Sequence, residues 1–128
     1  MTFVKLLSAV SALSIVACGA GQAFARDARF DAIAVSDARG VAAGEAGYGV
    51  GQGDTEDQAD IGAMHACKTH HNTNCKLLLT YRMCGAYASS ANHAGTGTGE
   101  TAQIARGGAL DSCGRATCKV VVADCVNQ

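Results

Sequence analysis

The sequence contains no proline and no tryptophan, and only three tyrosines and three phenylalanines among its 128 residues. A core with so few large side chains consists mostly of Ala, Val and Leu, and a small domain of that kind needs covalent cross-links. The net charge of −1 disfavours nucleic acid as a partner, since phosphate binding draws on clustered Lys and Arg. No apolar run reaches the ~20 residues of a membrane-spanning helix, so we expect no transmembrane helix.

The N-terminal residues have the order of a secretory signal peptide. Lys5 precedes an apolar run over residues 6–17, and Ala23-Phe24-Ala25 has the small-residue pattern of a cleavage site. Cleavage after residue 25 would leave residues 26–128 as a single periplasmic or secreted domain. Ile15-Val16-Ala17-Cys18 also matches the lipobox of bacterial lipoproteins, in which Cys18 would be lipidated and would anchor the protein. Simple cleavage is the favoured prediction, and a lipoprotein is the alternative.

Six of the seven cysteines lie beyond this N-terminal segment. An even number of cysteines in an exported chain predicts a disulfide framework. Six cysteines allow 15 pairings, and their spacing alone does not choose among them. The six are Cys67, Cys75, Cys84, Cys113, Cys118 and Cys125.

The chain contains an internal duplication, which is a signature to look for before any other. Segments 51–55 and 63–67 match segments 97–101 and 109–113, each in the same order. Residues 75–79, Cys-Lys-Leu-Leu-Leu, match residues 118–122, Cys-Lys-Val-Val-Val, and Cys84 then matches Cys125. We therefore predict two repeats, over about residues 30–84 and 85–126.

Each repeat has the pattern strand, strand, helix, strand. Thr55 followed by Gln58 forms a helix-capping signature at the start of the first helix. We predict an α+β fold in which an antiparallel sheet carries both helices on one face. The expected elements are strands 31–35, 47–53 and 76–83 with helix 56–67, then strands 85–89, 95–99 and 119–123 with helix 102–113.

The duplication suggests one symmetric disulfide pairing. Cys67–Cys75 would close the turn between the first helix and its following strand, and Cys113–Cys118 would do the same in the second repeat. Cys84 and Cys125 then remain at equivalent positions. We expect them to pair across the pseudo-twofold axis that relates the repeats.

These features together resemble one bacterial family, the domain of unknown function 4189. The resemblance rests on Ala32-Ile33-Ala34, the Ala-rich helix ending at Cys67, the Cys-Lys-apolar strands and the duplicated six-cysteine set up to Cys125, over about residues 30–126. It implies a small exported domain and brings no catalytic residue set. In that family an aromatic residue accompanies the strand glycines, whereas here Tyr48 alone remains.

The motifs that most invite a chemical interpretation are weak. The run Gly47–Gly53 precedes a helix, but Asp54 stands where a dinucleotide loop needs a third glycine, and acidic residues at a helix start would repel an anion. Cys67, His70, His71 and Cys75 have metal-ligand spacing. A disulfide would consume both thiols, and the second repeat has no histidine there. We expect neither metal nor cofactor, with His70 and His71 as weak candidates.

No catalytic constellation is apparent, so we expect a non-catalytic binding module, for example a periplasmic inhibitor or an immunity-type protein. Its partner would be another envelope or extracellular protein. The expected contact surfaces are the glycine-rich strands and the loop 68–74, which differ most between the repeats. The alternatives are a small envelope hydrolase using a His/carboxylate pair that includes His65 or His93, and a structural envelope component.

Overall fold

The computed structural model describes residues 29–70 and 72–127, so the expected signal segment, Cys18 and His71 lie outside the described residues. Within them, two helices and six strands follow one another in the predicted repeated order. Most strand ends lie within two residues of their expected positions. The elements are β1 (Phe30–Ser36), β2 (Gly47–Gly53), α1 (Glu56–Thr69), β3 (Cys75–Tyr81), β4 (Cys84–Ser89), β5 (Ala94–Gly99), α2 (Ala102–Cys113) and β6 (Lys119–Cys125).

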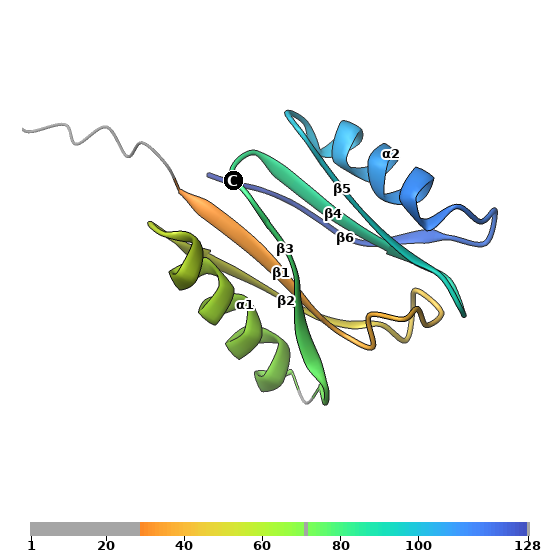
Figure 1. Ribbon diagram of the computed structural model, residues 1–128, viewed down its shortest axis with the longest axis horizontal. Coiled ribbons are helices and arrows are strands. Elements are labelled where there is room, and N and C mark those ends of the chain that lie inside the picture. The colour runs from red at the N-terminus through yellow and green to blue at the C-terminus, as the bar shows by residue number, and fades with distance from the viewer. Residues whose placement is uncertain (1–28, 71, 128) are drawn as a thin grey trace, which may run out of the picture.

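The strands form two antiparallel sheets of three strands, ordered β2-β1-β3 and β5-β4-β6. The predicted α+β class and the antiparallel pairing are confirmed. The expected single sheet is instead two sheets, and each helix covers its own sheet. Figure 1 shows α1 and α2 on opposite sides of the molecule with both sheets between them. The two helices therefore do not share one face.

The molecule has four layers, in the order helix, sheet, sheet, helix. Successive side chains along the central strands point to opposite faces, and this alternation explains the arrangement. In β1, Ala32 and Ala34 pack against α1, whereas Ile33 and Val35 face the other sheet. In β4, Ala86 and Ala88 likewise pack against α2, and Tyr87 faces β1's sheet. Both faces of each central strand are apolar, so each needs a covering layer on both sides. We call the contact between the two sheets the seam.

A bulge in each repeat adds apolar surface to the seam. The pairing of β1 with β3 shifts between Ile33 and Ala34, and the pairing of β4 with β6 shifts between Tyr87 and Ala88. The extra residue lets two successive side chains turn toward the seam. These are Leu78 and Leu79 on β3, and Val121 and Val122 on β6.

The glycine-rich strands β2 and β5 pack directly against the helices. A Cβ at Gly51 would lie 2.0 Å from the backbone N of Ala63, and one at Gly97 would lie 2.2 Å from the backbone O of Ala105. These glycines are therefore needed for close approach of helix and strand. The sequence predicts that the glycine-rich strands form a contact surface for a partner. This prediction is wrong for the strand faces on which the glycines lie, because α1 and α2 cover those faces.

Both helices begin at a threonine cap. Thr55 Oγ1 accepts a hydrogen bond from the Gln58 backbone N–H at 3.2 Å, and Thr101 Oγ1 accepts one from Ile104 at the same distance. The Gln58 side chain in turn accepts from the Asp54 backbone N–H at 2.9 Å. In a capping box the second hydrogen bond comes from the backbone N–H of the capping residue itself. Here it comes from the residue before Thr55. The predicted helix starts are therefore correct.

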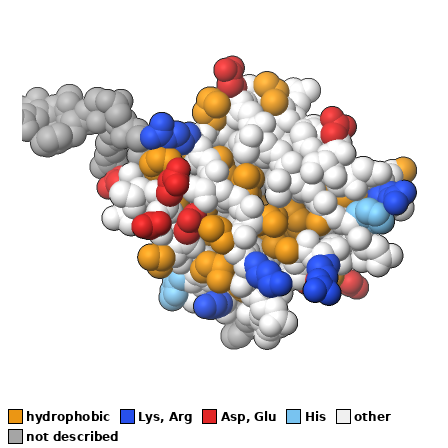
Figure 2. All heavy atoms as spheres, in the orientation of Figure 1, with side chains coloured by type: hydrophobic (Ala, Val, Ile, Leu, Met, Phe, Trp, Pro, Cys, Tyr) orange, Lys and Arg blue, Asp and Glu red, His pale blue; other side chains and the backbone are white. Residues whose placement is uncertain are grey.

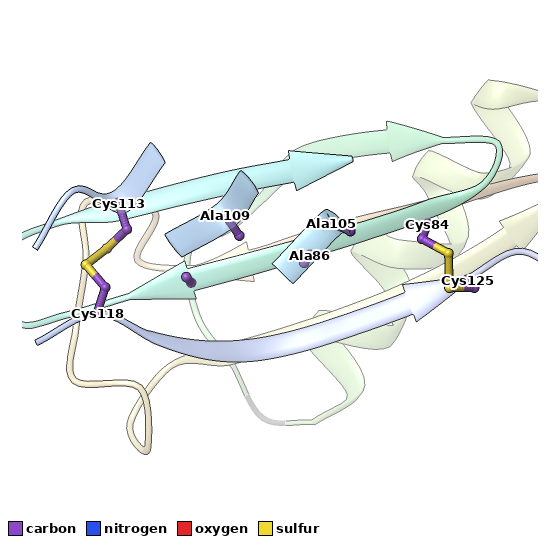
Figure 3. Packing of buried hydrophobic residues seen from close by; sticks show 8 residues of the cluster. Cys84, Ala86, Ala105, Ala109, Cys113, Cys118 and Cys125 are labelled. Carbon is purple, nitrogen blue, oxygen red and sulfur yellow. A yellow bond between two sulfur atoms is a disulfide. The ribbon is translucent and has the colours of Figure 1, made fainter. Parts of the chain in front are cut away.

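Three disulfides lie within the described residues: Cys67–Cys75, Cys84–Cys125 and Cys113–Cys118. These are the pairs proposed from the duplication. Cys84, however, opens β4, which lies beside β6, so its bond with Cys125 joins two strands of the second sheet and does not cross between the two sheets. Figure 3 shows the alanines of α2 and β4 packed together, with a disulfide at each end of the cluster.

Candidate functional site

A groove of about 430 Å³ lies between α1 and β3 on the outside of the first repeat. Its apolar side chains are Ile61 and Met64 from α1 and Leu77 from β3. Ile61 is 70% exposed and Leu77 is 42% exposed, although neither position is at an end of its element. The groove is bordered by Asp60, His65 and Lys68. In Figure 2, hydrophobic side chains on the α1 side lie next to a histidine and a basic side chain.

Local bonding keeps the border of this groove in place. The hydroxyl of Thr80 on β3 donates to Asp60 Oδ1 on α1 at 2.5 Å, so the two walls are joined at one end. The Cys67–Cys75 disulfide joins the same two elements at the other end. The walls therefore cannot separate easily, and the groove is a preformed surface.

The duplication provides an internal comparison for this groove. The fold places the same structural demands on equivalent positions of the two repeats, so differences at exposed positions are not required by packing. Ile61 of the first helix corresponds to Gly107 in the second, and His65 corresponds to Asp111. At this position the first repeat carries an exposed isoleucine where the second has glycine, and with Met64 and Leu77 this side chain forms an apolar patch.

Only one corner of this surface coincides with the contact loop predicted from the sequence. The predicted contact loop begins at Lys68, which borders the groove, and continues to Thr73 and Asn74, which directly precede β3. Those two residues line a separate, mixed-charge pocket of about 760 Å³ together with the loop after β1, which includes Arg39. Ile61 belongs to no recognisable motif, and the signal that marks it in the sequence is its replacement by Gly107 when the two repeats are aligned.

The histidines considered for hydrolysis are not joined to a carboxylate. His65 lies on the exposed side of α1. His93 Nε2 accepts a hydrogen bond from Arg115 Nε at 3.0 Å, so it faces a cation. Among the described side chains, no hydrogen bond links either histidine to Asp or Glu.

The predicted metal site loses its two cysteine ligands to a disulfide. Cys67 and Cys75 are bonded to each other, so neither offers a thiolate. His70 caps the C-terminal end of α1 and is exposed, and His71 lies outside the described residues. Within residues 29–70 and 72–127, no group of three or more His, Cys, Asp or Glu side chains gathers at one point.

A polar cluster lies inside the seam, although none is predicted there from the sequence. Asp31 of β1 is fully buried, and neither of its carboxyl oxygens has a hydrogen-bond partner among the described residues. Across the seam, Asp124 of β6 accepts a hydrogen bond from the Tyr81 hydroxyl at 2.7 Å. Tyr81 belongs to the first sheet and Asp124 to the second, so this bond joins the two halves.

The environment of this cluster alters its acid–base chemistry. Burial, followed by the neighbouring Asp124 carboxyl, raises the pKa of Asp31 to about 7, and the Arg29 cation opposes this rise. Burial and the hydrogen bond to Asp124 likewise raise the pKa of the Tyr81 hydroxyl. The pair resembles two carboxyls sharing one proton, but Asp31 has no exposed surface from which to reach a substrate.

Glycine makes room for this cluster. A Cβ at Gly85 would lie 2.4 Å from the Tyr81 ring, so the ring can reach Asp124 only because the position in β4 has no side chain. Two signals in the sequence could have revealed the cluster. Asp31 interrupts an otherwise apolar strand, and Tyr81 and Asp124 occupy equivalent places in the two repeats, each on the last strand of its repeat.

Comparison with known proteins gives one match. A family model described as Domain of unknown function (DUF4189) matches residues 30–125. Neither a curated protein nor a solved structure matches the chain. The three disulfides indicate an oxidising, extracytoplasmic environment. Within the described residues, no helix is both long and apolar enough to cross a membrane.

Proposed function

The chain belongs to the family of domains of unknown function DUF4189, and from its geometry we propose that it acts as an exported, non-catalytic binding module. The observation that carries this proposal is the exposed Ile61 in the α1–β3 groove, opposite Leu77 and at a position where the second repeat has Gly107. Burial of such side chains is the main favourable term in most protein association. The module is exported through its N-terminal segment to the periplasm or the medium.

The partner of this groove is a protein segment with an apolar side chain that enters between Ile61 and Leu77. Lys68 at one border attracts an acidic residue of the partner, and Asp60 at the same groove favours a basic one. A fixed orientation of the partner follows from these two charges. A periplasmic inhibitor that plugs a hydrolase, or an immunity-type protein, is one form that this function takes.

Replacing Ile61 by aspartate is expected to weaken partner binding at least tenfold without unfolding the domain. The few residues that dominate an interface cluster near its centre and cost about 2 kcal/mol or more when truncated, and an added charge costs more. The test is photo-crosslinking in the native envelope, with the crosslinker at Leu77 and with either Ile61→Asp or the parent sequence. We expect one crosslinked partner in the parent and its loss in the variant.

The control is Ile104→Asp on α2, which introduces the same charge at another exposed isoleucine, 54% exposed, outside the groove. This substitution should leave the crosslink unchanged. Loss of the crosslink in both variants would show a general effect of surface charge, and an unchanged crosslink in Ile61→Asp would refute the groove as the contact surface. A far-UV circular dichroism spectrum of each variant establishes that the fold is kept.

A further inference from the structure

The two halves of the domain are held together without any disulfide between them. Cys67–Cys75 joins α1 to β3, Cys113–Cys118 follows α2, and Cys84–Cys125 joins β4 to β6, so each bond lies within one half. In the described part of the chain, the connection between the halves is the two residues Arg82 and Met83. The contact between the halves therefore depends on apolar packing, on the Asp31, Tyr81 and Asp124 cluster, and on hydrogen bonds such as the one that Ser89 Oγ donates to the Val41 carbonyl at 2.8 Å.

We propose that Asp31 and Asp124 share one proton across the seam and form a pH-sensitive latch between the two halves. With the proton in place, one carboxyl is neutral and the seam stays closed. When the proton leaves, two carboxylates oppose each other in an apolar contact layer, and the halves loosen. The observations behind this latch are the complete burial of Asp31, its two unpartnered oxygens and the attachment of Asp124 to Tyr81 at 2.7 Å.

None of the described groups around Asp31 fully compensates the negative charge of its carboxylate, so neutralisation requires a proton. Arg29, two residues earlier in the chain, is the cation that acts on it, and its charge only partly offsets the effect of burial. On β3 the neighbour in register is Tyr81, and on β2 it is the uncharged Gln52. From the second sheet, Asp124 approaches, and its own neighbour on β4 is Gly85. An uncompensated buried charge is costly, so loss of the proton disfavours the closed seam.

The direction of the pH effect follows from the raised pKa of Asp31. In the closed seam the proton is held up to a pH of about 7, whereas an exposed aspartate releases it near its ordinary value of 3.8. The contribution of the latch is therefore greatest below a pH of about 4, falls as the pH rises from there to about 7 and changes little above that. Each unit of pKa difference is a factor of ten, so seam opening at pH 8 should exceed that at pH 5 by roughly 10- to 100-fold.

The tyrosines of the seam offer a direct measurement. The chain has no tryptophan and three tyrosines, of which Tyr81 and Tyr87 are buried in the seam and Tyr48 is exposed. In a Tyr48→Phe background, tyrosine emission of the oxidised protein reports on the seam alone. We expect quenching by acrylamide to increase between pH 5 and pH 8, with a midpoint near the pKa of Asp31, about 7.

Two variants decide whether the pair causes this change. Asp31→Asn keeps the side-chain shape, cannot ionise and can donate to Asp124, so quenching should become independent of pH and stay at the low, mild-acid value. Asp111→Asn on the exposed face of α2 should behave like its parent. If Asp31→Asn does not fold, Asp124→Asn removes the opposing carboxylate and should move the midpoint to lower pH.

Three results would overturn the proposal. Quenching that does not change with pH in the Tyr48→Phe protein would show that the seam stays closed without the proton. An equal pH response in Asp31→Asn would assign the effect to another group. Restoration of low quenching at pH 8 by added calcium or magnesium would show that the carboxyl pair binds a cation in place of a proton.

Discussion

Replacing Gly51 by alanine is expected to prevent folding or to lower the melting temperature of the oxidised domain by roughly 15 °C or more. The new methyl carbon would lie 2.0 Å from the Ala63 N and 2.3 Å from the Ala59 O. Both atoms belong to the backbone of α1, which cannot move aside by a side-chain rotation. The helix must therefore shift as a whole and lose its close packing against β2.

The size of this effect follows from the kind of contact. Overpacking a core commonly costs about 1–3 kcal/mol, and relief by side-chain movement keeps many cases in that range. At Gly51 no side-chain movement can relieve the clash, so we expect a cost of about 3 kcal/mol or more. In a domain of about 100 residues, each kcal/mol corresponds to roughly 4–8 °C. Thermal unfolding followed by circular dichroism measures the change, and the yield of oxidised protein reports a failure to fold.

Gly107→Ala is the matched control, since it makes the same substitution on α2. A Cβ at Gly107 has no atom within 4 Å, and the position lies inside a helix. We expect stabilisation by about 0.5–1 kcal/mol, because glycine is a poor residue in a helix interior. A loss of less than 1 kcal/mol in Gly51→Ala would contradict the close approach of α1 and β2.

The elements of the fold could be predicted from the sequence because the duplication repeats each signal. Thr55 and Thr101 mark two helix starts, and the glycine-rich strands precede both helices. The division into two sheets could not be predicted in the same way. Only two residues, Arg82 and Met83, separate β3 from β4, and so short a connection normally joins neighbouring strands of one sheet. Here the strands diverge because both faces of β1 and β4 must be covered.

The candidate site was harder to predict than the fold. Ile61 looks like an ordinary apolar helix residue until its exposure is known, since an isolated hydrophobic residue on a helix is normally part of the core. Asp31 raises the opposite difficulty, because a charged residue near a strand end normally faces solvent. Its burial depends on the second sheet, which no local pattern in the sequence specifies.

Removing the Cys84–Cys125 disulfide is expected to lower the free energy of unfolding by about 4 kcal/mol. The bond closes a loop with a sequence separation of 41 residues, so its absence gives the unfolded chain much additional freedom. The double variant Cys84→Ala/Cys125→Ala avoids a free thiol. Urea unfolding at neutral pH measures the loss, and a stability of 5–15 kcal/mol is typical of a native domain, so the variant should be near the limit of folding.

The Cys113–Cys118 bond provides the comparison, because its sequence separation is only 5 residues. Its removal by the same double substitution should cost about 2 kcal/mol if restriction of the unfolded chain is the main effect. Both bonds lie in the same alanine-lined cluster, so the loss of buried sulfur is similar in the two variants. A larger cost for the shorter loop would show that Cys113–Cys118 acts mainly by holding the end of α2 against its sheet. Cys84–Cys125 cannot act in this way, because it joins β4 to β6.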